Sequence, residues 1–190
     1  MSALAKTSER EICVAVRELL ERHGEAGLSM QAVAAAVGVR APSLYKRFAN
    51  RTDLLSAAAR DALMELAELL GDPPHNAETY ENLERMAHLY RKFGKRHPRM
   101  YALIFSETLA AREDLLAARQ AAAEPLLRLL TRAVGRESAL PAARMLVSYL
   151  HGFLSMELAK TFRFGGNVQE AFQYGLTKML DSLLPGKKPV

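Results

Sequence analysis

The chain has 190 residues, of which 49% are hydrophobic and 25% are charged, and its formal net charge is +5. This balance is typical of a folded globular protein and excludes a disordered or collagen-like chain. No apolar run approaches the roughly 18 residues of a membrane span, and Glu9 and Glu11 lie where a signal peptide would need its apolar core. We therefore expect a cytoplasmic protein without membrane contact. The single cysteine, Cys13, excludes an intramolecular disulfide and a cysteine-based zinc site.

Apolar residues recur at three- and four-residue spacing along the chain, and period-two runs of β-branched residues are absent. This pattern predicts an all-α fold. Ser8 with Glu11, Ser29, and Asn50 with Asp53 have the identity and spacing of helix N-caps. A Gly-Asp-Pro-Pro sequence at 71–74 marks the clearest break, and 185–190 reads as a frayed basic tail. The predicted helices cover residues 8–23, 30–38, 41–48, 51–70, 77–96, 99–109, 114–134 (with a kink at Pro125), 140–164 and 168–184.

Residues 30–48 have the spacing of a helix-turn-helix. Ala34 is the small residue that a close crossing of two helices needs, and Gly38, four positions later, tolerates the positive φ of the turn. The apolar positions expected to face inward are Val33, Val37, Val39, Leu44 and Phe48. Between Arg40 and Thr52 there are four basic residues and no acidic one. A basic helix face alone is more often a solvated surface, but together with the turn it favours DNA binding.

These residues resemble the TetR family of transcriptional regulators. The resemblance rests on Gly38-Val39, Leu44-Tyr45, Phe48 and Leu54-Leu55, and it covers residues 8–55. Arg40, Arg47 and Arg51 stand where the family pattern has Ser, His and Lys, so each substitution keeps or adds positive charge. The resemblance implies a helix-turn-helix DNA-binding domain at 1–55 and a helical domain for effector binding and dimerisation at 56–190.

The resemblance also implies which residues touch double-stranded DNA. Tyr45, Arg47 and Arg51 would contact phosphates, and Ser29 would add a backbone contact. The positions facing base edges in the major groove would be Arg40, Ala41, Pro42, Ser43 and Lys46. Arg40 and Lys46 are suited to the O6 and N7 acceptors of guanine, and the apolar surfaces of Ala41 and Pro42 suit a thymine methyl group. Tyr45 can equally be a core aromatic residue with its hydroxyl at the edge.

The predicted helix at 140–164 is apolar almost all round, and a monomer could not cover both of its faces, while the helix at 168–184 carries one apolar stripe. We therefore expect a homodimer held by a four-helix bundle, with Gly152 permitting a close helix crossing. Tyr149-Leu150-His151-Gly152 is similar to the WHG motif of one TetR C-terminal subgroup. The expected interface residues are Tyr149, Gly152, Phe153, Phe172, Leu176, Met179 and Leu183.

Through the resemblance, the middle helices are expected to form a cavity for a small-molecule effector. Methionine and aromatic side chains suit an irregular apolar cavity, although each residue by itself is as readily explained by core packing. The expected lining is Met86, Tyr90, Phe93, Met100, Tyr101, Phe105 and, with weaker grounds, His151. His151 is more often a satisfied core or interface histidine.

Three other features have both an ordinary and a functional explanation. The basic residues from Arg91 to Arg99 can stabilise a helix C-terminus, bind an anionic ligand or contact flanking DNA phosphate. Glu84 and His88 lie four residues apart, but two ligands do not make a metal site. Nothing in the sequence lowers the pKa of Cys13 enough for redox sensing. We expect neither a metal nor another cofactor.

The sequence thus predicts a ligand-responsive regulator, most readily a repressor released from a palindromic operator by a small, largely apolar effector. A transcriptional activator fits the same residues. An all-α binding protein or enzyme with an incidental helix-turn-helix is the alternative from another class. No catalytic arrangement of Ser, Cys, His or paired carboxylates supports an enzyme, so we expect none.

Overall fold

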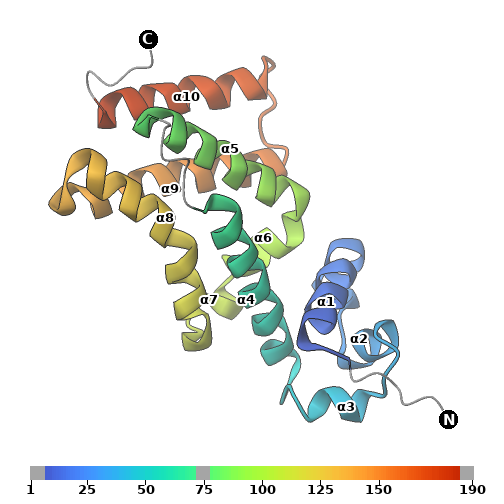
Figure 1. Cartoon of the computed structure of the whole chain (residues 1–190). Helices are drawn as coiled ribbons and strands as arrows, with labels where there is room; N and C mark the ends of the chain where they lie inside the picture. The colour runs from blue at the N-terminus through green and yellow to red at the C-terminus, as the bar shows by residue number, and fades with distance from the viewer. Residues whose placement is uncertain (1–6, 72–77, 185–190) are drawn as a thin grey trace. The chain divides into compact units, whose positions relative to one another are not determined.

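The computed structural model describes residues 7–71 and 78–184, and within these ranges it contains α-helices and two short 3-10 helices but no strand. The predicted break at 72–74 and the predicted tail at 185–190 lie outside the described residues. The elements in chain order (Figure 1) are α1 (Glu9–His23), η1 (Glu25–Gly27), α2 (Met30–Ala36), α3 (Ala41–Tyr45), α4 (Arg51–Leu70), α5 (Thr79–Arg96), α6 (Pro98–Ile104), α7 (Glu107–Ala110), η2 (Glu113–Leu115), α8 (Leu116–Val134), α9 (Arg136–Leu158) and α10 (Val168–Leu183). The all-α prediction is confirmed.

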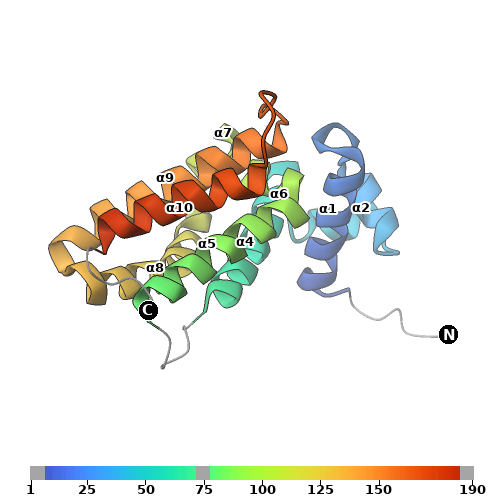
Figure 2. The ribbon, with the colours of Figure 1, turned by 90° about the horizontal axis from the view of Figure 1, so that it is seen from above.

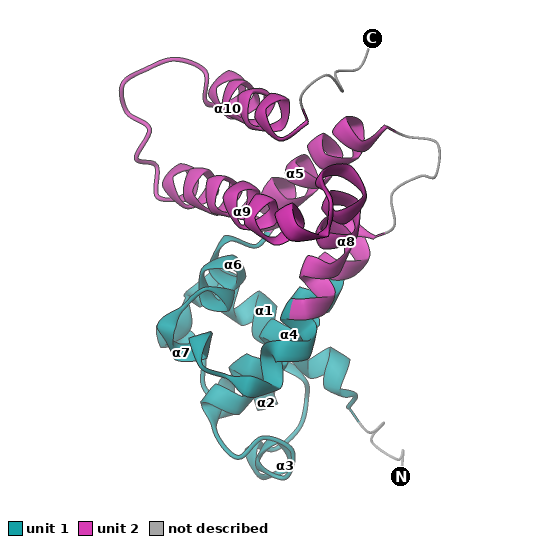
Figure 3. Ribbon diagram, turned by 90° about the vertical axis from the view of Figure 1, so that its left-hand side faces the viewer, with its two compact units in different colours: residues 1–65, 97–119 teal, residues 66–96, 120–190 magenta. Residues whose placement is uncertain are grey.

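The chain forms two compact units, coloured separately in Figure 3. Unit 1 contains residues 1–65 and 97–119, and unit 2 contains residues 66–96 and 120–190. Unit 1 therefore combines the first helices with α6 and α7, which come later in the sequence. These two units are defined by which residues pack together. The boundary predicted at residue 55 instead separates the residues expected to bind DNA from those expected to bind an effector.

The N-terminal helices of unit 1 pack through one apolar face of α1. The side chains of Ile12, Val16 and Leu20 are buried there, one helical turn apart. The α1 helix begins at the predicted capping box: the backbone N–H of Glu11 donates to Ser8 Oγ at 3.2 Å, and that of Ser8 donates to the Glu11 carboxylate at 2.7 Å. These two bonds satisfy backbone groups that a helix start leaves without partners.

In unit 2, α9 and α10 lie side by side, and α5 packs against both (Figure 2). The buried side chains of α9 recur at Leu146, Leu150 and Leu154. Those of α10 recur at the same spacing, at Phe172, Leu176 and Leu180. A single stripe on each helix therefore builds the core of this unit.

Two predicted helices differ most from the structure, while the helix predicted at 41–48 ends at Tyr45 and the helix predicted at 114–134 begins at Leu116. Residues 99–109 form α6 and α7 instead of one helix, because the Ser106 hydroxyl donates to the Leu103 carbonyl at 2.8 Å and offers the backbone a local turn. The helix predicted at 140–164 spans Arg136–Leu158 instead. It ends early because Lys160 adopts a φ of 56° and Thr161 N–H donates back to the Met156 carbonyl, which closes the last turn.

Candidate nucleic-acid interface

The helices α2 and α3 are joined by the tight turn that the sequence predicts. Gly38 has a φ of 68°, in the left-handed region that favours glycine. The N–H of Val39 donates to the Ala34 carbonyl at 2.9 Å and so closes the turn onto α2. Ala34 is buried, as a close crossing of two helices requires. The requirement for Gly38 is conformational, since a Cβ at this position would meet nothing within 4 Å.

The helix α3 has one buried and one exposed side. Leu44 is 1% exposed, and Phe48 just beyond the helix is also buried. Val33 is buried as predicted, but Val37 and Val39 are only half-buried because they border the turn. Anchoring by Leu44 leaves the other side of α3 to solvent, where Tyr45 is 50% exposed. The predicted base-facing residues lie there: Arg40, Pro42, Ser43 and Lys46 are exposed, and Ala41 is half-buried.

Two of the residues predicted to contact phosphate, Arg47 and Arg51, differ in the hydrogen bonds that they make within the chain. Arg47 is exposed, and its Nη1 donates to the Thr7 carbonyl at 2.6 Å, which connects the backbone just before the N-cap of α1 to the end of α3. Arg51 donates through Nε to the Leu28 carbonyl at 2.8 Å and through Nη2 to the Glu25 carbonyl at 2.6 Å. The Arg51 guanidinium thus fastens the start of α4 to the connection between α1 and α2. Sequence reasoning missed this role because the partners are backbone atoms more than twenty residues away.

The helices that flank this turn are capped as predicted. Ser29 Oγ accepts from the N–H of Ala32 at 3.1 Å and starts α2. Asn50 Oδ1 accepts from the N–H of Asp53 at 2.9 Å and starts α4. Arg17 of α1 forms ion pairs with Asp61 and Glu65 of α4. The helices on either side of α3 therefore start with capped backbone N–H groups, and α1 is paired with α4, so the exposed basic side of α3 lies on a well-bonded group of helices.

Comparison with known proteins agrees with this geometry. The family described as bacterial regulatory proteins, tetR family, matches residues 12–58, and the tetracyclin repressor-like C-terminal domain matches residues 83–179. The chain belongs to the TetR family. It is accordingly a transcriptional regulator that binds DNA through a helix-turn-helix. The TetR N-terminal match contains α2 and α3 entirely.

The individual proteins that resemble this chain share less than 30% of their residues with it. The HTH-type transcriptional regulator Rv0681 of Mycobacterium tuberculosis is 28% identical over 81% of this chain and 72% of its own length. Among solved structures, a possible TetR family regulator of Streptomyces coelicolor has a TM-score of 0.73 at 21% identity, covering 93% of this chain and 98% of its own. A TetR variant of Acinetobacter baumannii in complex with minocycline has a TM-score of 0.73 at 22% identity, covering 97% and 100%. These two structures support the TetR fold alone.

The predicted effector residues of this TetR-family chain are divided between its units. Met86, Tyr90 and Phe93 are buried in unit 2, and Met100 and Tyr101 are buried in unit 1. Phe105 is exposed, with its ring centroid 5.0 Å from that of Tyr101. His151 is half-buried on α9, and burial lowers its pKa.

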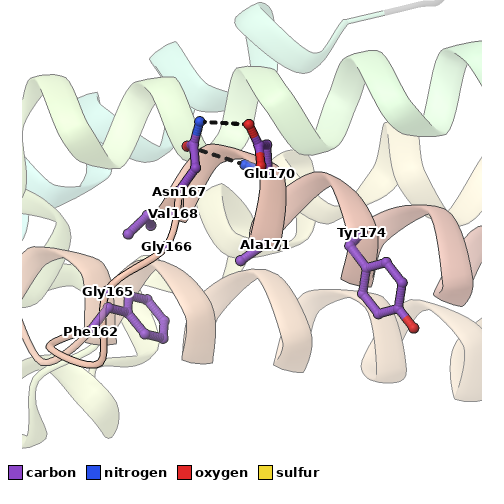
Figure 4. Close-up of a pocket in the computed structure, with 8 residues that line it drawn as sticks. All are labelled: Phe162, Gly165, Gly166, Asn167, Val168, Glu170, Ala171 and Tyr174. Carbon is purple, nitrogen blue, oxygen red and sulfur yellow. Dashed lines mark hydrogen bonds between the residues drawn. The ribbon is translucent and has the colours of Figure 1, made fainter.

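A surface hollow of about 410 Å³ lies at the connection between α9 and α10 (Figure 4). Phe162 and Tyr174 stand on either side of it, and Gly165 and Gly166 form part of its wall. Asn167 caps α10 beside it, accepting from the N–H of Gln169 at 2.9 Å. None of the predicted effector residues lines this hollow. In the sequence, the only indication of this hollow is the pair of phenylalanines followed by two glycines at 162–166, and that pattern predicts a helix end and not a binding site.

Two of the predicted dimer residues are part of the subunit core. Phe172 and Leu176 are fully buried within one chain, so their side chains do not face a partner. An amphipathic stripe looks the same whether it meets its own chain or another, which is why the sequence placed them at the interface. Tyr149 and Phe153 are half-buried between α9 and α10, and Tyr149 Oη donates to the Phe172 carbonyl at 2.7 Å. Gly152 is exposed, and Met179 and Leu183 are half-buried.

The basic residues from Arg91 to Arg99 have internal partners in most cases. Arg91 is 5% exposed and binds both oxygens of Glu157, at 2.7 and 2.8 Å, with its guanidinium 4.4 Å from the Phe172 ring. Lys95 also donates to Glu157, at 2.7 Å. Burial alone would raise the pKa of Glu157, but these donors hold it below its usual value. This part of the cluster therefore stabilises the packing of α5 against α9.

The remaining groups with chemical reactivity are the possible metal ligands and the single cysteine. In residues 7–71 and 78–184, no three His, Cys, Asp or Glu side chains gather as metal ligands. Among the helices described, none has the length and apolar character needed to cross a membrane. Cys13 is buried, and burial together with nearby Asp61 and Glu9 raises the pKa of its thiol to about 11. A thiol with this pKa is protonated at neutral pH and is a poor redox sensor.

Proposed function

We propose that the chain is a homodimeric repressor that leaves a palindromic operator when a small, largely apolar effector binds. The observation that carries the proposal is the exposed side of α3, where Arg40, Ser43 and Lys46 project from a helix that Leu44 anchors. Arginine and lysine donors match the O6 and N7 acceptors of guanine in the major groove. Tyr45 and Arg47 would contact phosphates and set the position of α3 on the duplex.

The dimer would form through an exposed face of α9. Met145, Ser148, Gly152 and Met156 are exposed and share one face at 100° per residue, opposite the buried leucines. Tyr174 on α10 is also exposed. Unpartnered apolar side chains in this arrangement are typical of a helix that meets a second subunit. This face replaces Phe172 and Leu176 in the proposed interface.

The effector would bind among residues of the C-terminal domain, for which 56–190 remains the proposed extent. Met86, Tyr90 and Phe93, which are buried on α5 in unit 2, are the candidate contacts, whereas Met100 and Tyr101 are buried in unit 1. Support comes from their apolar character and from the minocycline complex of an Acinetobacter baumannii TetR with the same fold.

The DNA proposal is tested by selecting bound fragments from sheared genomic DNA with the full-length protein. We expect an inverted repeat whose half-site centres are about 34–36 Å apart, or a multiple of that distance. Lys46→Ala should weaken binding to this repeat and relax its sequence preference. Arg132→Ala removes the same charge from exposed α8 and is the matched control. Equal binding of all fragments at every salt concentration would refute the proposal.

The regulatory part needs two further measurements. A reporter carrying the selected operator should be silenced by the protein, whereas activation would identify the alternative role. A ligand that releases the operator should bind the operator-bound protein more weakly than the free protein, by the same factor by which it weakens DNA binding. If its affinity is unchanged by saturating operator, the proposed coupling is wrong.

A further inference from the structure

The connection between α9 and α10 carries an exposed aromatic side chain next to a hollow. Phe164 is 106% exposed, the highest value among the large hydrophobic residues in the part of the chain that the structure describes. The hollow of about 410 Å³ lies between Phe162 and Tyr174, beside Ala171 (Figure 4). Phe162 and Gly165 line it, but Phe164 between them does not. The Phe164 ring therefore points away from the hollow of its own chain.

The shape of this surface is fixed within one chain. The Phe162 ring packs on that of Phe153, with 4.8 Å between the ring centroids. Gly165 and Gly166 have φ values of 82° and 81°, a left-handed backbone that turns the chain directly after Phe164. A Cβ on either glycine would meet nothing within 4 Å, so this wall of the hollow is open to an incoming side chain. A surface that is already ordered loses little conformational entropy when it binds.

The charges beside the exposed ring and beside the hollow have opposite signs. Lys160 and Arg163 are exposed and precede Phe164 in the connection. Glu170 is one of the residues that line the hollow, and its carboxylate accepts from Asn167 Nδ2 at 3.0 Å. An aromatic ring with an arginine beside it thus matches an aromatic hollow with a carboxylate beside it.

A second copy of the same chain supplies this match. In a two-fold symmetric pair the same surface of both subunits is buried, so a projection and a hollow on that surface each meet their counterpart. The surface is also continuous with the face proposed for dimerisation. Tyr174 belongs to both, and the carbonyl of Met156 on the α9 face accepts from Thr161 Oγ1 of the connection at 2.9 Å.

We propose that Phe164 of each subunit enters the hollow of the other subunit and that Arg163 pairs there with Glu170 across the interface. The inference rests on the proposed homodimer and adds a contact that the α9 face alone does not supply. Each contact occurs twice in a symmetric dimer, so the loss of one side chain per subunit acts twice on the dissociation constant.

The first test is the dimer dissociation constant of the full-length protein, measured by sedimentation equilibrium. Phe164→Ala should raise it by about a hundred-fold, because roughly ten-fold is lost at each of two buried rings. Leu116→Ala removes an exposed apolar side chain from unit 1 and should leave the constant unchanged. Arg163→Glu should weaken the dimer, whereas Arg132→Glu at an exposed position of α8 should not. Combining Arg163→Glu with Glu170→Arg exchanges the two charges and should restore the dimer.

The second test locates the side chain directly. Chains carrying Phe164→Cys are mixed with chains carrying Ala171→Cys and treated with a short bifunctional maleimide. The two kinds of chain should become linked to each other, as mass spectrometry of the joined peptides would show. Native Cys13 is buried and does not compete. Ser182→Cys replaces Ala171→Cys in the control, because it lies on the same exposed face of α10 three turns further along, and it should not be linked.

Phe164, Arg163 and Glu170 are exposed in the single chain, so their variants should keep the circular dichroism of the wild type. A wild-type dimer whose dissociation constant is the same in Phe164→Ala would overturn the inference alone, and the α9 face would remain the interface. Linking to Ser182→Cys in place of Ala171→Cys would overturn it as well. A wild type that is monomeric at micromolar concentration would instead refute the proposed homodimer, and this inference with it.

Discussion

Arg47 and Arg51 carry the same charge four residues apart, yet their surroundings give them different roles. Arg47 is exposed at the end of α3, with one bond to the Thr7 carbonyl. Arg51 directs Nε and Nη2 at the carbonyls of Leu28 and Glu25. A guanidinium engaged with backbone oxygens has fewer donors left for a phosphate. We therefore expect Arg47 to contribute to DNA electrostatics and Arg51 to hold the frame of the helix-turn-helix.

Substituting each arginine by alanine separates these roles. Arg47→Ala should weaken binding to operator and random DNA alike and reduce the slope of log K against log salt concentration by roughly one unit. Arg51→Ala should leave that slope unchanged and lower the free energy of unfolding by about 1–2 kcal/mol, through lost charge-assisted hydrogen bonds. Salt titrations and urea unfolding measure the two effects. A reduced slope for Arg51→Ala would show that Arg51 contacts phosphate after all.

At the scale of helix pairs, α9 and α10 approach closely at Gly175. A Cβ on Gly175 would lie 2.9 Å from both Cε2 and Cζ of Tyr149, well inside van der Waals contact. The Tyr149 hydroxyl cannot simply move away, because it donates to the Phe172 carbonyl at 2.7 Å. There is therefore no room for a side chain at position 175 inside the subunit. At exposed Gly152, by contrast, a Cβ would meet nothing within 4 Å.

Gly175→Ala should accordingly destabilise the fold by about 1–3 kcal/mol through overpacking, although alanine is the better helix former by about 1 kcal/mol. Urea unfolding gives the measurement. The double variant with Tyr149→Phe removes the hydroxyl that crowds the new methyl group. It should be less destabilised than the sum of the two single variants. Additive effects would mean that Tyr149 is not the residue that excludes a side chain at Gly175.

Asp114, just before α8, is bound to Arg112 and to Ser56 of α4, and the strength of these contacts depends on pH. The Arg112 guanidinium, with a smaller contribution from the Ser56 hydroxyl, lowers the pKa of Asp114 from 3.8 to about 2. Because the folded pKa lies below the unfolded one, this carboxylate stabilises the fold fully above about pH 4 and loses its contribution as the pH falls toward 2. Asp114→Asn should lack this contribution.

The difference in unfolding free energy between the wild type and Asp114→Asn should therefore be constant from pH 7 to about pH 5 and shrink below pH 4. Urea unfolding at a series of pH values measures it. Glu113→Gln changes the same formal charge at the neighbouring exposed position and serves as the control. A difference that stays constant down to pH 3 would contradict the ion pair.

The sequence was sufficient wherever the determining contacts are local. The caps at Ser8, Ser29 and Asn50 and the turn at Gly38 depend on residues within five positions, and all four were predicted and confirmed. The end of α9 was missed because Lys160, and not a glycine, adopts the left-handed conformation.

Long-range partners account for the remaining differences at the site. The carbonyls that Arg51 binds and the α1 terminus that Arg99 binds are set by tertiary packing, and no spacing in the sequence encodes them. Leu176 illustrates the same limit. Its helical stripe correctly indicated burial, but only the structure shows that α10, which carries it, packs against α5 and α9 of the same chain.

At the scale of the whole molecule, operator recognition depends on two copies of α3 held at a fixed spacing. The proposed means is the exposed face of α9, where Met145 and Met156 flank Ser148 and Gly152. Small residues at the centre permit close approach of a second helix, and flexible methionine side chains can fill the space on either side. Met156 is 48% exposed in the single chain, so a charge there is solvated until a partner covers it.

Met156→Glu should therefore give a folded monomer with weak operator binding, because burying an unpaired carboxylate at the interface costs several kcal/mol. Leu176→Glu, whose site is 0% exposed within one chain, should instead unfold the subunit. Light scattering and circular dichroism distinguish the two outcomes, and Gln120→Glu at an exposed position of α8 controls for one added negative charge. The monomer should still bind random DNA with an undiminished salt slope per chain, since the face of α3 is intact. If Met156→Glu remains a dimer at micromolar concentration, the subunits associate through another face, and the spacing of the two recognition helices must be set elsewhere.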